Sequence, residues 1–249
     1  MIRLIVLLMV LAIPAKAETI VLGLSHDRVS ITATFEGSEI LIFGAVKRDA
    51  PMPDTGDLGV IITVAGPAVP VTVRRKDRRL GIWVNTDNVE VSAAPTFYAV
   101  ATSSPMNEIL RDVEDLRYRV TIPRAIRSVG ALVSDSETFT EALIRIRADQ
   151  DLYQILEEAV DVEQDTLFRT SIALPANLTE GDYVARILLT RDGRVIDEYT
   201  ANIPVYKVGL ERWLFNLAHE NAFLYGLMSL SIAIAAGWLA SAAFSLLRR

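Results

Sequence analysis

The chain ends in a long apolar run, and this run constrains its architecture more than any other feature of the sequence. From Ala222 to Leu247 there are 26 residues without a charge, which as an α-helix would extend about 39 Å. Such a helix can cross a hydrocarbon core of about 30 Å with some tilt. A buried helix in a large soluble core is the alternative, but the lack of charge at a chain terminus disfavours it. We therefore predict one transmembrane helix over residues 222–247.

The charges that flank this run indicate its direction. Arg248 and Arg249 follow it directly and form the predicted cytoplasmic tail, whereas His219, Glu220 and Asn221 precede it. Positive charge marks the cytoplasmic end of a membrane span. The bulk of the chain is therefore expected outside the cytoplasm, held by one C-terminal helix.

Residues 1–17 have the composition of a secretory signal peptide. Arg3 precedes an apolar stretch, LIVLLMVLAI, and small residues follow at Ala15 and Ala17. Signal peptidase reads this small-x-small pattern. The apolar stretch would rise only about 15 Å as a helix, which is too short to span a membrane. Cleavage after Ala17 is the favoured interpretation, and a retained anchor is the alternative.

The predicted exported stretch, residues 18–220, is acidic and contains no cysteine. It holds all 31 acidic residues and 21 of the 25 basic ones, for a net charge of −10. This balance disfavours nucleic acid as a partner. Without cysteine there is no disulfide and no thiolate metal site. A stretch of about 200 residues can bury a core without such cross-links, as one large domain or two small ones.

Two parts of this stretch are predicted to be β-rich. Residues 18–102 hold short runs with alternating apolar positions, such as RVSITATF, broken by Gly and Pro. Strands return over residues 165–207, where Asp192-Gly193 is a two-residue hairpin signal. We predict a mainly β (α+β) fold, an immunoglobulin-like antiparallel β-sandwich, in which the second part completes the first sandwich or forms another.

One local motif favours the immunoglobulin-like interpretation. In LPANLTEGDYVARILL, Gly181 is expected to turn the chain and Tyr183 to fold back on it. This arrangement looks like the tyrosine corner of immunoglobulin-like sandwiches.

Residues 103–164, between the β-rich parts, are predicted to form a helical insertion. Ser104 is expected to cap its first helix, with Pro105 at the first helical position. A second helix is expected from Thr138, where Thr-Phe-Thr-Glu is a capping box. The apolar positions at helical spacing are Ile109, Leu110, Val113 and Leu116 in the first helix, and Phe139, Leu143, Ile146, Tyr153, Leu156 and Val160 in the second.

Residues 208–221 are predicted to form a juxtamembrane amphipathic helix that leads into the span. Trp213 and Phe215 lie where an interfacial aromatic belt would be, and Tyr225 lies just inside the span. We expect these three residues to act as interfacial anchors.

Small residues recur at every fourth position along the transmembrane run. Such a small-xxx-small ladder lets helix backbones approach closely, which is what associates helices in lipid. Small residues are also frequent in membrane spans generally, but we interpret this ladder as a helix-pairing interface. Its members are Ser229, Ala233, Gly237, Ser241 and Ser245.

A basic segment, RRKDRR, contrasts with the acidic background. We expect it in a turn between two strands, where its five basic side chains would project together. Because arginine binds oxyanions and carboxylates bidentately, the segment is a candidate contact for an anion or an acidic partner loop. The alternative is a charged hairpin tip that blunts edge pairing. The basic residues are Arg74, Arg75, Lys76, Arg78 and Arg79.

Motifs for catalysis or metal binding are weak. SHD at 25–27 places neighbours on opposite faces of a strand, and a catalytic triad is assembled from separate segments. DTG at 54–56 lacks the apolar strand that precedes an aspartic protease turn. The acidic segment EEAVDVEQD lacks the glycine and the final glutamate of a calcium loop, and we interpret it as a solvated helix end. We assign no catalytic, cofactor-binding or metal-binding residues.

The order of motifs along the chain resembles the "putative transmembrane protein" family of alphaproteobacteria, over nearly the whole mature chain. The resemblance implies an exported, single-span inner-membrane protein with its body in the periplasm. Members of this family are often encoded beside a polytopic permease of the sulfite-exporter (TauE/SafE-like) type, so the resemblance implies such a partner. The resemblance brings no catalytic residues with it. The segments that carry it are FEGSEILIFGAV, LGIWVNT, PTFYAVATS, LFRTSIALPANLTEGDYVARILLTRDG and YGLMSLSIAIAAGWLASAAF.

We therefore expect a non-enzymatic accessory or binding module that pairs with a multi-span membrane protein, such as a small-anion permease. A stand-alone periplasmic sensor of a ligand or metal, working through the acidic or the basic segment, is the alternative. A hydrolase is a third hypothesis.

The predicted sidedness can be tested with a reporter that fluoresces only in the cytosol. Inserted near Thr166, the reporter should stay dark, because this part of the chain is expected outside the cytoplasm. The same reporter placed after Arg249 should fluoresce and serves as the control. Fluorescence from the insertion near Thr166 would show that the topology is reversed.

Overall fold

A computed structural model describes residues 18–25, 29–31, 37–48, 56–127, 136–207 and 210–247. The predicted signal peptide and the two terminal arginines lie outside the described residues. The strands are β1 (Glu18–Leu24), β2 (Val29–Ile31), β3 (Ser38–Arg48), β4 (Leu58–Ala65), β5 (Ala68–Arg79), β6 (Ile82–Pro95), β7 (Tyr98–Thr102), β8 (Tyr153–Leu156), β9 (Asp161–Glu163), β10 (Leu167–Leu174), β11 (Gly181–Arg191) and β12 (Arg194–Lys207). The helices are α2 (Met106–Ile109), α3 (Asp112–Tyr118), α4 (Ile122–Ala125), α5 (Ser136–Ala148), α6 (Leu210–Glu220) and α7 (Ala222–Leu247).

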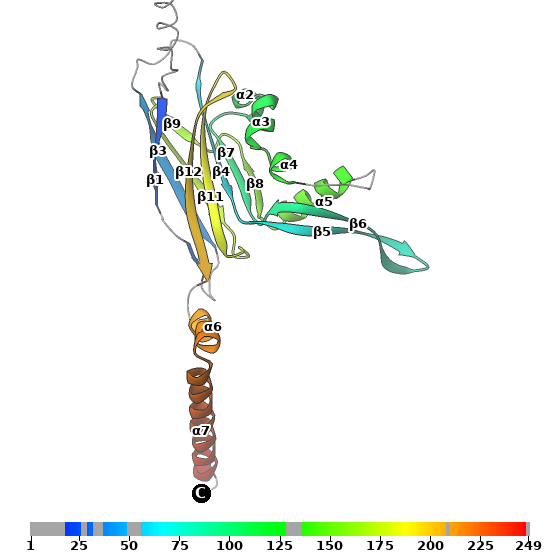
Figure 1. The fold of residues 1–249 in the computed structure, drawn as a ribbon, viewed down its shortest axis with the longest axis vertical. Coiled ribbons are helices and arrows are strands. Elements are labelled where there is room, and N and C mark those ends of the chain that lie inside the picture. Colours follow the sequence, from blue (N-terminus) through cyan, green and yellow to red (C-terminus); the bar gives the residue numbers. More distant parts are fainter. Residues whose placement is uncertain are drawn as a thin grey trace, which may run out of the picture. The chain divides into compact units, whose positions relative to one another are not determined.

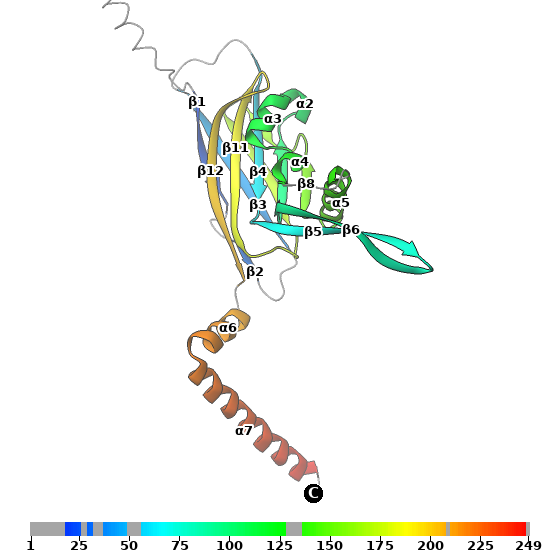
Figure 2. The same cartoon turned by 45° about the vertical axis from the view of Figure 1, so that its right-hand side comes forward.

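Two facing sheets form the body of the protein (Figures 1 and 2). One has the strand order β1-β3-β10-β9 and the other β2-β12-β11-β4-β7-β8, while β5 and β6 form a separate two-stranded hairpin. The predicted mainly β fold with a C-terminal apolar helix is therefore confirmed. One strand pair departs from the predicted antiparallel pattern, because β7 and β8 run parallel.

Burial follows the position of each strand in these layers. In β10 every second residue is buried, as expected for a strand with one face on the core. In β4, at the centre of the larger sheet, residues 58–64 are all buried. Both faces of β4 are covered, since Ile109 of α2 packs closely against Gly59 on the side away from the facing sheet. The helical segment therefore acts as a third layer over the larger sheet.

The expected corner at the start of β11 is present. Gly181 has a φ of +147°, and an added Cβ would lie 2.7 Å from the ring of Pro67. The buried Tyr183 donates a hydrogen bond from its hydroxyl to the carbonyl oxygen of Thr179, at 2.8 Å. A tyrosine that bonds to the backbone a few residues upstream is the feature the sequence motif predicted.

The first predicted helix is broken in two. Leu110 is extended, with a φ of −141°, so α2 ends at Ile109 and α3 begins at Asp112. The four expected apolar positions therefore do not form one continuous stripe. Ile109 and Leu110 are buried, whereas Val113 and Leu116 are exposed.

The second predicted helix is shorter than expected. Helix α5 ends at Ala148, and the chain then turns through Asp151, which has a φ of +58°. Tyr153 and Leu156 lie on strand β8 instead, where they extend the larger sheet beyond β7. Pairing with a strand that is distant in the sequence decides this segment, and helical periodicity alone does not reveal such pairing.

A buried carboxylate joins the two facing sheets. Glu18 of β1 is 8% exposed. Its Oε1 lies 2.9 Å from Nε of Arg48 on β3 and 2.8 Å from Nη2 of Arg191 on β11. Arg191 also donates to the carbonyl oxygen of Gly56 at 2.7 Å, and Arg48 donates to Thr166 Oγ1 at 3.1 Å. We call Glu18, Arg48 and Arg191 the carboxylate clamp.

The C-terminal part of the chain forms a second compact unit, Tyr206–Arg249 together with Ser30–Phe35. Within the described residues, α7 is the one helix long and apolar enough to cross a membrane. The candidate span is Ala222–Ser241, with a mean hydropathy of 1.8 and none of it buried.

Removing the clamp carboxylate should destabilise the fold. We expect Glu18→Ala to lower the free energy of unfolding by about 3 kcal/mol, because two largely buried guanidinium groups would lose their counter-charge. Thermal unfolding of the detergent-solubilised chain, followed by circular dichroism, measures this loss.

Glu163→Ala provides the control for this measurement. Glu163 pairs with Arg169 at 3.5 Å, and both side chains are 61% exposed. Exposed pairs contribute about 0–1 kcal/mol, so this variant should unfold close to the unmodified protein. Equal destabilisation by the two changes would contradict a structural role for the clamp.

Candidate functional site

The outer face of the four-stranded sheet carries an exposed apolar surface. Val21, Leu41, Phe43 and Leu167 are each between 41% and 55% exposed. The strand register places them together: Val21 and Leu167 both pair with Ala45, while Phe43 pairs with Gly23 on the adjacent strand. We call these four residues the sheet patch.

The sheet patch has a charged border. Nε of Arg169 on β10 lies 3.3 Å from Oδ2 of Asp161 on β9, and Nη2 of Arg169 lies 3.5 Å from Oε1 of Glu163 on the same strand, β9. A hollow of about 190 Å³ opens here and is lined by Phe43, Gly44, Asp161, Glu163, Leu167, Phe168 and Arg169. An apolar surface with a polar border has the anatomy of a protein-binding site.

The contacts of Arg169 also account for two of the acidic residues in the segment EEAVDVEQD. Asp161 and Glu163 lie on strand β9 and face Arg169, so this part of the segment is not the solvated helix end that the sequence predicted. Within the described residues, no group of three or more His, Asp or Glu side chains is placed to hold a metal ion. His26 and Asp27 of SHD, and Asp54 and Thr55 of DTG, lie outside the described residues.

The second candidate surface is the hairpin of β5 and β6, which projects from the body (Figure 1). Its base is anchored, because Val89 and Val91 are buried and α5 packs on both strands. The guanidinium carbon of Arg75 lies 4.6 Å from the ring centroid of Phe139 on α5, a cation–π contact. Beyond this contact nearly all residues are exposed.

The basic segment is in strand β5 rather than in a turn, which corrects the prediction. The turn lies further along, at Leu80 and Gly81, which have φ values of +50° and +88°. Positive φ at both positions is the requirement of a type I′ turn. Gly81 adopts positive φ without a steric cost. The last pair of the hairpin, Arg79 with Ile82, directly flanks the turn.

Strand geometry also separates the five basic side chains, which were expected to project together. Successive residues of a strand point to opposite faces, so Arg74, Lys76 and Arg78 share one face. Arg75 and Arg79 share the other face with Asp77, whose carboxylate lies 3.7 Å from Nε of Arg79. A hollow of about 520 Å³ beside the hairpin is lined by Arg75, Lys76, Asp77, Arg79, Val84, Asn85, Thr86 and Asp87. Its mixed charges do not form a dedicated anion cradle.

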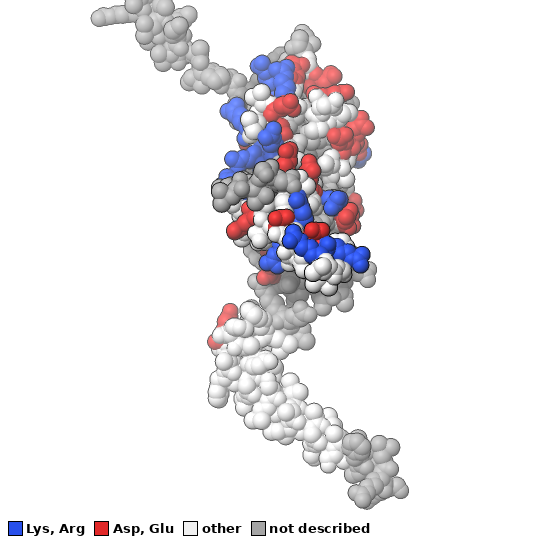
Figure 3. Space-filling view, turned by 90° about the vertical axis from the view of Figure 1, so that its right-hand side faces the viewer, with Lys and Arg blue, Asp and Glu red and all other residues white. Residues whose placement is uncertain are grey.

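The end of the hairpin is apolar, a feature that the sequence analysis missed. Leu80, Ile82 and Trp83 are 105%, 65% and 68% exposed. In Figure 3 the hairpin points towards the viewer, and basic side chains gather beside uncharged ones at its end. The missed signal was the sequence LGIW directly after the basic segment. Leu80 belongs to a Leu-Gly pair that can form a turn, and Ile82 and Trp83 follow it directly. Large apolar side chains at a turn are not expected to belong to the core.

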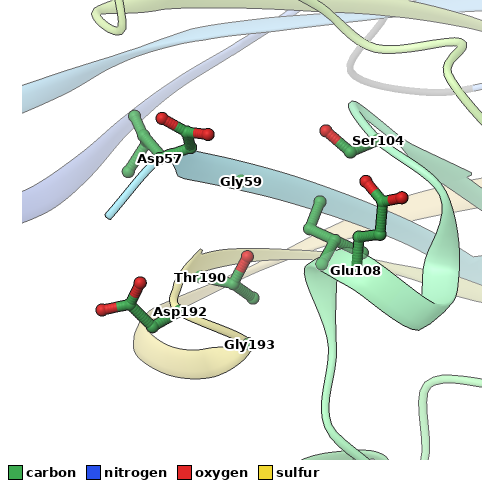
Figure 4. Close-up of a pocket in the computed structure, with 9 residues that line it drawn as sticks. Asp57, Gly59, Ser104, Glu108, Thr190, Asp192 and Gly193 are labelled. Atoms are coloured by element: carbon green, nitrogen blue, oxygen red, sulfur yellow. The ribbon is translucent and has the colours of Figure 1, made fainter. Parts of the chain in front are cut away.

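A polar hollow beside the start of β4 and the end of β11 is the third candidate. Figure 4 shows Ser104 and Glu108 on one side of it, and Asp57 and Asp192 on the other. Its volume is about 180 Å³, whereas pockets for small organic ligands typically measure about 300–1,000 Å³. This hollow therefore suits water or an ion better than an organic substrate.

The side chains of the transmembrane run are exposed along the predicted ladder. Ser229, Ala233, Gly237 and Ser241 are all exposed, and an added Cβ on Gly237 would meet no other atom within 4 Å. The side chain of Ser245 lies outside the described residues. The ladder is thus open to contact by another helix.

The three expected interfacial anchors are exposed as well. Trp213 and Phe215 lie on α6 and Tyr225 lies near the start of α7. Phe215 stacks on His219, with ring centroids 4.0 Å apart. Trp213 and Tyr225 thus remain available to an interface.

Comparison with known proteins identifies a family. A family model described as "Putative transmembrane protein" matches residues 19–246. None of the curated proteins compared with the chain matches it. Among solved structures, the chain is similar to dimeric latent PorU from Porphyromonas gingivalis, at 9% sequence identity and a TM-score of 0.14. That match covers 77% of this chain and 24% of the PorU chain, and it supports no conclusion about fold or function.

Proposed function

The chain belongs to the family described as "Putative transmembrane protein", and on that basis we propose that it is a membrane-anchored accessory module that binds a multi-span membrane protein. In this proposal α7 anchors the chain in the inner membrane. The β-rich body lies in the periplasm, and the C-terminus is cytoplasmic. The partner we propose is a small-anion permease of the sulfite-exporter-like type, in keeping with the family resemblance of the sequence. The module itself performs no chemical step.

The observation that carries this proposal is the sheet patch. A monomeric soluble domain rarely leaves a row of large apolar side chains exposed on neighbouring strands unless the surface binds something. The surface spans three strands: Val21 of β1 and Leu167 of β10 both lie opposite Ala45 of β3, and Phe43 lies two residues from Ala45 on the same face of β3. Three charged residues border it, Arg169, Asp161 and Glu163, and they can orient a docked protein.

The ladder on α7 supports the proposal independently. Helices in lipid associate through close packing over small residues, because hydrocarbon offers no hydrophobic drive between them. Contact through both the sheet patch and the membrane helix would link two weak interactions on one chain, which raises the overall affinity.

Purification of the tagged full-length chain in mild detergent tests the proposal. We expect an integral-membrane protein to co-purify, and Phe43→Asp to reduce its recovery several-fold, because a charge would be buried in the apolar contact. Val113→Asp is the control, since Val113 is also an exposed apolar residue, at 74% against 45% for Phe43, but lies on α3. Absence of any membrane partner, or equal loss with both variants, would count against the proposal.

The same preparation can test the ladder. Ala233→Leu places a large side chain on the ladder, whereas Ala235→Leu places it about 200° further round the helix, at about 100° per residue. Only the first change should weaken recovery of the partner. Indifference to both changes would indicate that α7 is a simple anchor.

A further inference from the structure

The apolar end of the hairpin is a separate surface from the sheet patch. Leu80, Ile82 and Trp83, which we call the apolar tip, lie around the turn that joins β5 and β6. The side chain of Leu80 is fully exposed, at 105%. It therefore contributes nothing to the core, and its presence needs another explanation.

The backbone at this turn makes the leucine more unusual. Leu80 has a φ of +50° in a type I′ position, where Asn, Asp and Gly are preferred because they tolerate the left-handed conformation. The left-handed conformation is unfavourable for leucine, and the fully exposed side chain makes no packing contact that would offset this. A residue that is unfavourable for the fold and fully exposed is more readily explained by function than by stability.

Basic side chains stand directly behind the apolar tip. Arg78 pairs with Trp83 and Arg79 pairs with Ile82 across the hairpin. Three more basic residues precede them on β5, further from the tip: Arg74, Arg75 and Lys76. Between positions 74 and 87 there are five basic and two acidic residues, a net charge of +3. The hairpin thus carries apolar groups at its end and cations within about 20 Å of them, at about 3.4 Å per residue.

This layering matches the edge of a lipid bilayer. Leucine and isoleucine favour the acyl boundary, tryptophan favours the interface, and arginine and lysine reach the phosphate groups of anionic lipids. We propose that the apolar tip inserts into the interfacial region of a bilayer that contains anionic lipid, while the basic side chains behind it contact the headgroup phosphates.

Two features favour lipid over a protein as the occupant. The tip is convex, at the turn of a projecting hairpin, and so is shaped to enter a soft surface rather than to receive a ligand. The chain also carries a candidate membrane span of its own, which keeps a bilayer at high local concentration.

The acidic body does not prevent this contact. Charges separated by more than about 8 Å are largely screened at physiological ionic strength. The hairpin projects from the body (Figure 1) and carries the basic segment on β5, so headgroups at the tip respond mainly to that segment. The inference needs only the membrane anchor and does not depend on the proposed partner.

Fluorescence of Trp83 in nanodiscs tests the inference. The chain has three tryptophans, so Trp213→Phe combined with Trp238→Phe leaves Trp83 as the single probe in the full-length chain. In discs that contain phosphatidylglycerol with brominated acyl chains, we expect blue-shifted emission and strong quenching. Discs of phosphatidylcholine alone, with the same brominated acyl chains, or raised salt, should reduce the quenching several-fold. Emission typical of water-exposed indole in every disc would overturn the inference, and would leave the proposed partner binding untouched because no partner is present.

A turn variant separates lipid contact from folding. Leu80→Asn suits the type I′ position better, so the melting temperature should stay the same or rise while quenching falls several-fold. Leu116→Asn, which removes an exposed leucine from α3, is the matched control and should leave quenching unchanged. Equal quenching in Leu80→Asn and the parent would refute insertion of the tip. Cross-linking of the tip to an acidic protein in cells, with no quenching in discs, would also refute it.

Discussion

The carboxylate clamp is the interaction on which the relation between the two sheets depends. Apolar core contacts are non-directional and tolerate small sliding movements. Burial of Glu18, by contrast, is favourable only if both guanidinium groups reach its carboxylate with good geometry. The clamp therefore ties β1 and β3 of one sheet to β11 of the other at a defined position. Because it holds β1 and β3 in place, it also supports the strands that display most of the sheet patch.

The described part of the chain presents three exposed surfaces that are candidates for binding. The sheet patch is broad and apolar with a charged border, which suits a protein. The hairpin tip is narrow, convex and backed by cations, which suits a lipid interface. The ladder on α7 suits another helix. These surfaces are chemically distinct, and in the two proposals one anchored chain uses them for different partners, a membrane protein and the surrounding lipid.

Local signals in the sequence predicted several elements well. Asp192-Gly193 does form the two-residue turn between β11 and β12, with positive φ at both residues, and Tyr183 makes its corner bond. The basic segment was misplaced because a run of charges resembles a turn, whereas the following Leu-Gly pair can adopt the required φ values. The helix predicted beyond Ala148 failed because the apolar residues around Tyr153 satisfy a strand next to β7 equally well. Only the presence of β7 at that edge distinguishes the two interpretations.

The sequence alone determined the membrane helix and the mainly β character of the rest, because both follow from the composition and periodicity of neighbouring residues. It also located the cationic segment and the small-residue ladder. Tertiary structure alone decided that Val21, Phe43 and Leu167 share one exposed face, and that Glu18 meets Arg48 and Arg191. These groupings join residues up to 173 positions apart in the chain. They arise from which strands pair with one another, and that choice depends on contacts between segments that lie far apart in the sequence.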